Sequence, residues 1–342
     1  MFNQILVPLD GSSLAEGAIP HAELFARIFG AKIFLLQVLE PTSYHENPKA
    51  VDPLNWQIRK AEADLYMQGI ASHIRENLGE SLLSTEVEKK SRVEYCIREG
   101  KAAENIVDFA HSEDIDLLVI STHGSGGLSR WNISSVTQKV INLIYLPVLI
   151  VRSYDRPSAA GIIPRYRRIL LPIDSSRRAE CSLSAGIELA RGEMPGSTTP
   201  DGMVEKSVLY LAAVIRPPEV PIPEPFPVEI SRLSEELLQV SHQAVDKYLS
   251  EMKERLPVEC DTCVVEGVSV VSAIHELAEK EDVDIVVLCA HGYSGQVTWP
   301  YGTVTRNYIE HGTKPVLVIQ DIPLSQVRQT AAEVAAEKSG RR

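Results

Sequence analysis

Two aspartates are the first residues of this chain whose type and position suit chemistry. Asp10 and Asp174 each end a short apolar run that reads as a buried strand. A carboxylate at the end of a strand can accept hydrogen bonds from sugar hydroxyls. It can equally cap the helix that follows, because Ser12 or Ser175 comes shortly after and helix starts favour such residues. From the aspartates alone, capping is the commoner role.

Small residues gather in a loop further along each half of the chain. The loops read Thr122-His-Gly-Ser-Gly-Gly127 and Ala290-His-Gly-Tyr-Ser-Gly295. Without bulky side chains, backbone N–H groups can approach phosphate oxygens closely. Ten residues after the glycines Gly124 and Gly292 comes a second small pair, Ser134-Ser135 or Gly302-Thr303, where a helix should begin. Helix N-termini attract anions, so the combination predicts a phosphate site, although glycines also serve ordinary turns.

These features occur twice because the chain contains two copies of one unit. Asp10 and Asp174 lie 164 positions apart, and the segment 115–124 matches 283–292 at an offset of 168. Two further pairs keep the offset of 168: Trp131 with Trp299, and Pro147 with Pro315. Ordered matches at nearly constant spacing indicate a duplicated domain. The predicted boundaries are domain 1 at 1–152, a linker at 153–166, domain 2 at 167–321 and a tail at 322–342.

Each copy alternates apolar runs with stretches of helical period. The predicted strands are 4–9, 32–38, 115–121 and 147–151 in the first copy and 167–173, 206–214, 258–265, 283–289 and 315–319 in the second. The predicted helices of the first copy are 13–29, 55–77, 101–112 and 134–144. Continuous Val/Ile/Leu runs indicate strands covered on both faces, and the helices between them imply right-handed βαβ units.

The predicted fold class is therefore α/β, with two tandem doubly wound domains. Each domain is expected to hold a five-stranded parallel sheet with helices on both faces. Ligands of such sheets bind beyond the carboxyl ends of the strands, where the strand order reverses. The aspartates and the small-residue loops are expected at that edge.

The second copy resembles the universal stress protein family, and the resemblance covers the chain apart from the linker and tail. ATP-binding members of that family carry Pro-x-Asp at the end of the first strand and Gly-x2-Gly-x9-Gly-Ser/Thr after the fourth. The second copy carries this spacing at Pro172, Asp174, Cys289, Gly292, Gly302 and Thr303. It departs from the family pattern only at Cys289.

The resemblance implies an adenine-nucleotide site of the alpha-hydrolase-like fold, holding ATP and any Mg²⁺ that its phosphates bring. Asp174 would hold the ribose and Val214 would contact the adenine. The phosphates would lie against Gly292, Gly302 and Thr303. The remaining positions of this site are Pro172, Leu288, Cys289 and Val304, and the corresponding residues of the first copy are Asp10, Val38, Gly124, Ser134 and Ser135.

The first copy departs from the family pattern at two of its three glycines, Ser121 and Ser134. If position 134 needs a positive φ or a close phosphate, a serine there costs about 1–3 kcal/mol. Since about 1.4 kcal/mol is a tenfold change in affinity, we expect weaker binding in the first copy. Ser135 nevertheless keeps a hydroxyl at the helix start.

The resemblance implies a regulatory stress-response protein that binds ATP with little or no turnover; weak hydrolysis stays open. An alternative within the same family is an ATP-independent interaction scaffold. A third class, an enzyme of the wider adenine-nucleotide α/β group, lacks support because no paired acid and base are visible. His123 and His291 follow the predicted fourth strands, but neither has a carboxylate near it in sequence, so hydrogen-bonded loop histidines are favoured.

Family members commonly dimerise through their last strands. The resemblance therefore implies that strand 147–151 pairs with strand 315–319 inside one chain, as an intramolecular pseudo-dimer. A homodimer of whole chains and an unknown protein partner stay open.

Two other signals favour ordinary structure. Cys260 and Cys263 have the spacing of a metal or redox pair, but residues three apart in a strand face opposite sides, so burial is the favoured interpretation. Trp131 and Trp299 are expected to pack over the phosphate loops. The proline-rich stretch 216–227 replaces the connection from the second strand to the second helix and is read as a stiff lid or spacer rather than as a partner motif.

Composition limits the partners. The net charge of −12 argues against nucleic acid, which rewards clustered Lys and Arg. No apolar stretch approaches the roughly 18 residues of a membrane span, and no leader precedes the first strand, so no membrane partner is expected. Five cysteines, an odd number, fit a reducing cytoplasm.

Overall fold

The computed structural model describes residues 1–40, 53–79, 91–124, 133–152, 163–192, 206–219, 227–293 and 300–322. Within them the strands form one ten-stranded sheet in the order β3-β2-β1-β4-β5-β10-β9-β6-β7-β8. The strands of the first half are β1 (Gln4–Leu9), β2 (Lys32–Leu39), β3 (Val93–Glu99), β4 (Leu117–Ser121) and β5 (Val148–Val151). Those of the second half are β6 (Arg168–Pro172), β7 (Val208–Ile215), β8 (Cys260–Glu266), β9 (Ile285–Cys289) and β10 (Val316–Ile319).

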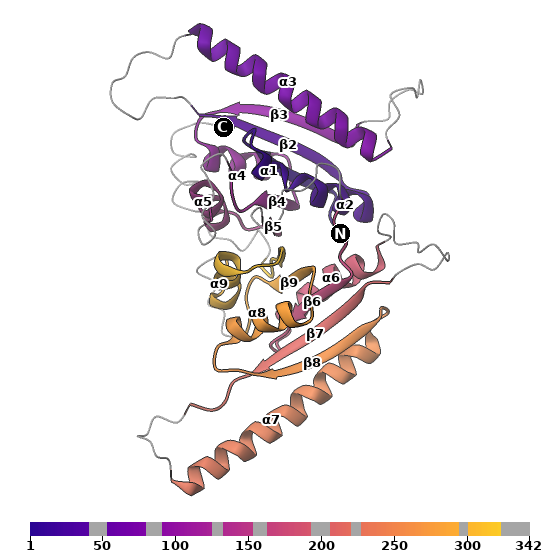
Figure 1. Ribbon diagram of the computed structural model, residues 1–342, viewed down its shortest axis with the longest axis vertical. Coiled ribbons are helices and arrows are strands. Elements are labelled where there is room, and N and C mark those ends of the chain that lie inside the picture. Colours follow the sequence, from indigo (N-terminus) through magenta and orange to yellow (C-terminus); the bar gives the residue numbers. More distant parts are fainter. Residues whose placement is uncertain are drawn as a thin grey trace.

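The helices lie between these strands in sequence. Those of the first half are α1 (Ser13–Glu16), α2 (Ile19–Phe29), α3 (Pro53–Asn77), α4 (Ala102–Ser112) and α5 (Ser135–Leu143). Those of the second half are the 3₁₀ helix η1 (Ala179–Ser182), α6 (Leu183–Arg191), α7 (Val228–Arg255), α8 (Val270–Lys280) and α9 (Thr303–His311). Figure 1 shows α3 and α7 at opposite ends of the molecule, with the rest of the fold between them. No helix in the described ranges has both the length and the apolar character that crossing a bilayer requires.

Each half has the same parallel strand order, and the order reverses beside its first strand. β1 pairs with β2 on one side and β4 on the other, and β6 likewise lies between β7 and β9. The α/β fold with two doubly wound domains is thus confirmed. The halves meet through β5 and β10, which run antiparallel with Val316 opposite Ile150 and Val318 opposite Val148. These are the two segments for which the resemblance implies pairing.

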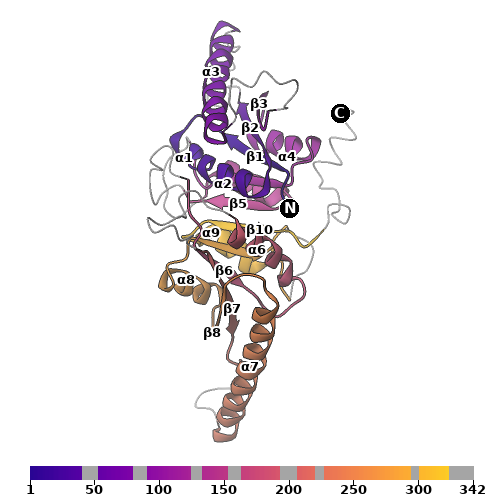
Figure 2. The ribbon, with the colours of Figure 1, turned by 90° about the vertical axis from the view of Figure 1, so that its right-hand side faces the viewer.

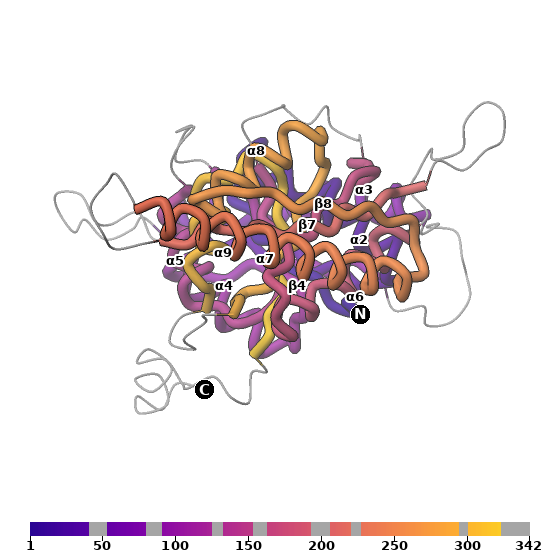
Figure 3. The backbone as a smooth tube through the Cα atoms, turned by 90° about the horizontal axis from the view of Figure 1, so that it is seen from below, coloured from indigo at the N-terminus to yellow at the C-terminus, as the bar shows by residue number. Residues whose placement is uncertain are grey.

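Apolar side chains fill the space on both faces of the sheet, as the continuous Val/Ile/Leu strands predict. One core cluster contains buried residues of α2, α3, α6 and α7, and the other contains those of α4, α5, α8 and α9. Both clusters extend across the two halves. In Figure 2, β5 lies directly above β10 at the middle of the molecule, where the two halves meet. Figure 3 shows α7 running across β7 and β8 at the end of the sheet.

Two predicted elements differ from the structure. The expected helix 13–29 is broken at Gly17, because Pro20 has no N–H to continue the ladder and stands instead in the first turn of α2. The strand β3 is absent from the runs predicted for the first copy. Its sequence mixes charged and apolar residues instead of forming a continuous apolar run, as suits a strand at the edge of the sheet.

Contacts outside the strand pair also join the halves. Tyr166, in the predicted linker, is buried and its hydroxyl contacts Nδ1 of His21 in α2. Its ring packs edge-on against Phe25, with the centroids 6.3 Å apart. Arg152, at the end of β5, donates from Nη2 to the carbonyl oxygen of Tyr308 in α9 at 2.9 Å. Positions 153–162 and the predicted tail from 323 onward lie outside the described residues.

Candidate functional site

The two aspartates end equivalent strands and make the same local contacts. Asp10 follows β1, and its Oδ1 accepts hydrogen bonds from the backbone N and Oγ of Ser12 at 3.0 and 2.5 Å. Asp174 follows β6 and accepts the same pair of bonds from Ser176, at 3.1 and 2.5 Å. Ser12 and Ser176, not the aspartates, cap the next helical turn. Each aspartate therefore organises its loop and keeps an exposed carboxylate at the carboxyl end of the sheet.

The capping residue of the second copy differs from the expectation. Ser176 Oγ accepts from the backbone N of Ala179 at 3.2 Å, as Ser12 Oγ does from Ala15. Ser175 has a φ of 61° and occupies the position of Gly11, whose φ is 82°. The turn needs this left-handed residue before the cap, so Ser175 is not available as the cap itself.

The small-residue loops meet the aspartates in both domains. A Cβ added to Gly124 would overlap Oδ2 of Asp10, and one added to Gly292 would overlap Oδ2 of Asp174. In the second domain the next residue also holds the carboxylate, since the backbone N of Tyr293 donates to Asp174 Oδ2 at 2.5 Å. Glycine is needed here because the loop approaches the carboxylate closely. The structure thus brings together site residues more than a hundred positions apart.

The helices α5 and α9 begin beside these loops in the same way. The backbone N of Ser134 donates to the carbonyl of Thr122, and that of Gly302 donates to the carbonyl of Ala290, each at 2.8 Å. These bonds hold the N-terminal amides of both nine-residue helices beside the loops, and a helix N-terminus can attract an anion. A threonine one turn in fixes each helix to the end of the fourth strand, through Thr137 on Ser121 and Thr305 on Cys289.

The expected penalty for serine at position 134 rested in part on a positive φ, and that part was wrong. Ser134 has a φ of −57° and caps α5, its side chain accepting from the backbone N of Thr137. Gly302 has a φ of −69°, which any residue can adopt. A Cβ at Gly302 would find ordinary contacts of 3.5 Å or more within the protein. Backbone conformation therefore does not distinguish the two domains at this position.

A cavity of about 870 Å³ lies at this edge of domain 1. All five site residues predicted in the first copy line it: Asp10, Val38, Gly124, Ser134 and Ser135. Its walls come from the ends of β1, β2 and β4 and from the starts of α4 and α5. A volume of this size is in the range of small-molecule sites, roughly 300–1,000 Å³. The cavity belongs to the domain whose motif departs further from the family pattern.

Residues of α3 that the sequence analysis missed complete the cavity. Arg59 lies at the wall and donates to the carbonyl of Glu40 at 3.3 Å. Tyr66 donates its hydroxyl to Glu16 Oε1 at 3.0 Å. Burial and the Glu16 carboxylate both raise the pKa of Tyr66, so it stays a neutral donor. The second copy repeats this contact between Tyr248 and Glu180 at 2.9 Å, but only the folded structure brings the two residues of each pair together.

The predicted residues of domain 2 occupy equivalent positions. Pro172 and Val214 are partly exposed near the ends of β6 and β7, and Thr303 and Val304 open α9. Leu288 and Cys289 are buried at the end of β9. Leu288 also belongs to the core cluster on one face of the sheet. Positions 294–299, including Trp299, lie outside the described residues, as does Trp131 in the first copy.

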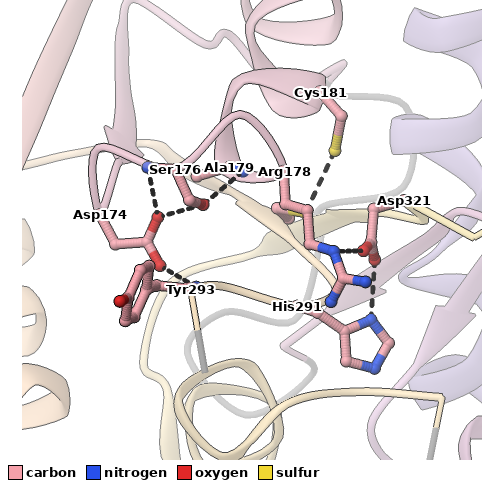
Figure 4. Close-up of polar contacts among 9 residues, drawn as sticks. Asp174, Ser176, Arg178, Ala179, Cys181, His291, Tyr293 and Asp321 are labelled. Atoms are coloured by element: carbon pink, nitrogen blue, oxygen red, sulfur yellow. Dashed lines mark hydrogen bonds and ion pairs between the residues drawn. The ribbon is translucent and has the colours of Figure 1, made fainter. Parts of the chain in front are cut away.

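His291 has a carboxylate partner that sequence proximity did not reveal. Its Nδ1 lies 2.7 Å from Oδ1 of Asp321, thirty residues away. Arg178 reaches Oδ2 of Asp321 at 3.4 Å, as Figure 4 shows. The side chains of His291 and Asp321 are only 0% and 3% exposed. These three residues therefore connect the loop after β9, the segment after β10 and the turn before η1. The imidazole of His291 is buried away from solvent.

The cysteine pair Cys260 and Cys263 faces opposite sides of the sheet, as expected. Cys260 belongs to one core cluster and Cys263 packs against the other. Among the described residues no group of three His, Cys, Asp or Glu side chains is placed to hold a metal ion. In the proline-rich stretch, positions 220–226 lie outside the described residues, and Pro227 directly precedes α7.

The fold and the paired edge sites define a tandem α/β protein with one candidate small-molecule site per domain. The model of the universal stress protein family matches residues 1–152 and 165–320. The chain belongs to this family. A universal stress protein of Mycolicibacterium smegmatis is 23% identical over 322 residues, covering 92% of this chain and 96% of that protein. One from Methanocaldococcus jannaschii is 28% identical over 158 residues, covering 44% of this chain and 83% of the relative.

Solved structures show the same architecture. A universal stress protein from Archaeoglobus fulgidus matches with a TM-score of 0.57 at 17% identity, covering 94% of this chain and all of that one. A protein of unknown function from Pseudomonas aeruginosa matches with a TM-score of 0.61 at 16% identity, covering 93% and 92% of the two chains. At such identities the likeness concerns the fold.

Proposed function

We propose that this universal stress protein binds ATP at the carboxyl edge of its sheet and acts as a regulatory protein with little or no turnover. The observation that carries the proposal is the cavity of domain 1, which all five motif positions of that copy line. Asp10 and Asp174 would accept bonds from ribose hydroxyls. The N-terminal amides of α5 and α9 would meet the phosphates.

The charges of the cavity bear on how a triphosphate would bind. Asp10, Glu40 and Glu62 bring three carboxylates to the wall, whereas Arg59 brings one guanidinium. A bare triphosphate would meet net repulsion there. A divalent cation carried by the phosphates removes much of that repulsion, so we propose that ATP binds as its Mg²⁺ complex.

Both domains are proposed to bind. Domain 2 has the more complete motif, and domain 1 has the described cavity. The aspartate–glycine contact and the docked helix N-terminus occur in each. The serines of the first copy are compatible with the backbone geometry, so the proposed difference in affinity is smaller than the motif suggests.

A regulatory role rather than catalysis is supported by the surroundings of the loop histidines. The side chain of His291 is buried and its Nδ1 contacts Asp321, and the side chain of His123 is also buried. A general base must reach the proton that it abstracts. The odd number of cysteines, five, supports the proposed place in a reducing compartment.

The first experiment is to denature freshly purified protein and identify released nucleotide by chromatography. Two equivalents of ATP per chain are expected, and one would assign binding to a single domain. Gly302→Val should remove the share of domain 2, because its added methyl groups occupy the space of a phosphate. Gly69→Val in α3 is the control, since an added Cβ there meets nothing within 4 Å. Absence of nucleotide, and no binding of added Mg·ATP, would overturn the proposal.

An ATP-independent scaffold is a second candidate because α7 carries exposed apolar side chains. Leu233, Leu237 and Val240 are 60%, 54% and 61% exposed and recur at helical spacing. Such a stripe can serve an interaction between helices. If nucleotide is absent, a Leu233→Glu, Leu237→Glu variant tests this candidate through its oligomeric state. A lower mass in light scattering than that of the unmodified chain would favour the scaffold.

A further inference from the structure

Two cysteines far apart in sequence lie in contact beside the candidate site of domain 2. The Sγ atoms of Cys181 in η1 and Cys289 at the end of β9 are 3.1 Å apart. Both are free thiols; Cys289 is buried and Cys181 is partly exposed. Figure 4 draws Cys181 and its dashed contact in one view with Arg178, Asp321 and His291. A disulfide needs sulfurs about 2.05 Å apart, so an approach of roughly 1 Å completes the bond.

We propose that Cys181 and Cys289 form a reversible disulfide, making domain 2 a site of thiol oxidation. The inference rests on the placement of these two side chains and does not require a bound nucleotide. The bond would fasten η1, which follows the Asp174 turn, to the strand end that precedes Gly292. Oxidation would therefore act on the two segments that form the candidate site.

The environment gives the two thiols different roles. Cys181 is open to solvent in part, so a dissolved oxidant reaches it first. The contact with Cys181 and burial both raise the pKa of the Cys289 thiol, and Asp321 adds to this. Cys289 therefore stays a protonated thiol that a dissolved oxidant does not reach, and its contact with Cys181 makes it the partner that resolves an intermediate formed there.

With a hydroperoxide as oxidant, the reaction balances in two steps. The sulfur of Cys181 attacks the peroxide, an S–O bond forms while the O–O bond breaks, and water or an alcohol leaves with the thiol proton. The sulfur of Cys289 then attacks the sulfenic sulfur, and the S–O bond breaks. The oxygen leaves as water with the proton of Cys289. Two thiols lose two electrons in total, and a small dithiol restores them by exchange.

The first domain provides an internal comparison. Ser121 stands at the position of Cys289, and Gly17 stands at that of Cys181. No such bond can form there. Domain 1 has the same fold without either thiol, so the fold does not need them. Cys289→Ser gives domain 2 the residue that domain 1 carries.

The test treats reduced, full-length protein with hydrogen peroxide, alkylates the remaining thiols and analyses peptides by mass spectrometry. We expect a linked peptide with Cys181 and Cys289, lighter by two hydrogens and lost on adding dithiothreitol. Cys96, Cys260 and Cys263 should stay alkylated. Alkylation of Cys181 and Cys289 after treatment, or a disulfide between chains on a non-reducing gel, would overturn the inference.

Variants distinguish a disulfide-forming pair from a Cys181 thiol that is oxidised by itself. In Cys289→Ser the sulfenic acid on Cys181 has no partner, so dimedone should label it strongly, whereas unmodified protein should lose most of that label to the disulfide. Cys263→Ser is the matched control and should behave as the unmodified chain does. Equal dimedone labelling with and without Cys289 would contradict the proposed role. The ATP content is measured separately, on reduced protein. The oxidation test does not depend on bound nucleotide, so the disulfide can be confirmed or contradicted even if ATP does not bind.

Discussion

At the scale of single residues, the neighbouring aspartate carboxylates require glycine at positions 124 and 292. Each lies where a Cβ would overlap the aspartate after the first strand of its domain. Those aspartates hold their own loops through Ser12 and Ser176. The glycine therefore preserves a hydrogen-bonded turn in addition to any role toward a ligand.

This contact predicts a specific cost. Gly292→Ala should displace Asp174 and weaken its bonds to Ser176 and Tyr293, lowering the free energy of unfolding by about 1–2 kcal/mol. Urea titration followed by circular dichroism measures the change. In an Asp174→Ala background the same substitution should cost little more. Gly302→Ala is the control, since its Cβ fits, and an equal loss there would contradict the argument.

His21 predicts a dependence of stability on pH. Burial lowers the pKa of this imidazole from 6.5 to about 4. Between these values the unfolded chain binds more protons than the folded chain, so stability falls as the pH falls from 6.5 toward 4. At about 1.4 kcal/mol per pH unit, the loss reaches at most about 3.5 kcal/mol.

The measurement is the free energy of unfolding across that pH range. His21→Gln should flatten the dependence, because glutamine does not titrate and can still bond to the Tyr166 hydroxyl. The exposed His73→Gln should leave the slope unchanged. Identical slopes in unmodified protein and His21→Gln would show that other groups govern the acid limb.

At the scale of elements, the N-termini of α5 and α9 reach the same place with different caps. Ser134 uses its side chain, whereas Gly302 has none. Both start beside a loop fixed by a backbone bond to the residue after the fourth strand. The helix position is thus retained while the capping chemistry has changed.

We expect Ser134→Ala to lower the stability of domain 1 by about 1 kcal/mol, because the backbone N of Thr137 loses its acceptor. Thermal unfolding with and without Mg·ATP is the readout. Ser135→Ala, one residue into the helix, should change stability by less. If both substitutions are neutral, water replaces the cap without loss.

At the scale of the whole molecule, β5 and β10 turn two five-stranded sheets into one. All residues of both strands are buried, so either domain alone would expose an apolar edge with unpaired backbone groups. Arg152 and Tyr166 add contacts across the same junction. The pairing of β5 with β10 within one chain is the form of pseudo-dimer that we propose for the protein in solution.

Separated domains provide the check. Residues 1–152 expressed alone should form a homodimer through β5, because the free edge pairs with a second copy. Light scattering after size exclusion measures the mass. Mixing with a separately expressed second domain should give a one-to-one complex instead. Monomers that ignore each other on mixing would contradict the proposed pairing.

The sequence by itself determined the duplication, the α/β class and the positions of the motif residues. Apolar runs and helical periods are properties of nearby residues, and the offset of Asp10 from Asp174 is a match between two segments of sequence that needs no knowledge of the fold. It missed β3, whose mixture of charged and apolar residues suits an edge strand, and it placed an unbroken helix across Gly17.

Only the tertiary structure decided which distant groups touch. Asp321 meets His291, Tyr66 meets Glu16 and Cys181 meets Cys289 across 30, 50 and 108 residues. Such pairs depend on strand order and on how helices pack over the sheet, and no local pattern encodes either. The cavity of domain 1 likewise arises from segments that come together only when the sheet reverses its order beside β1.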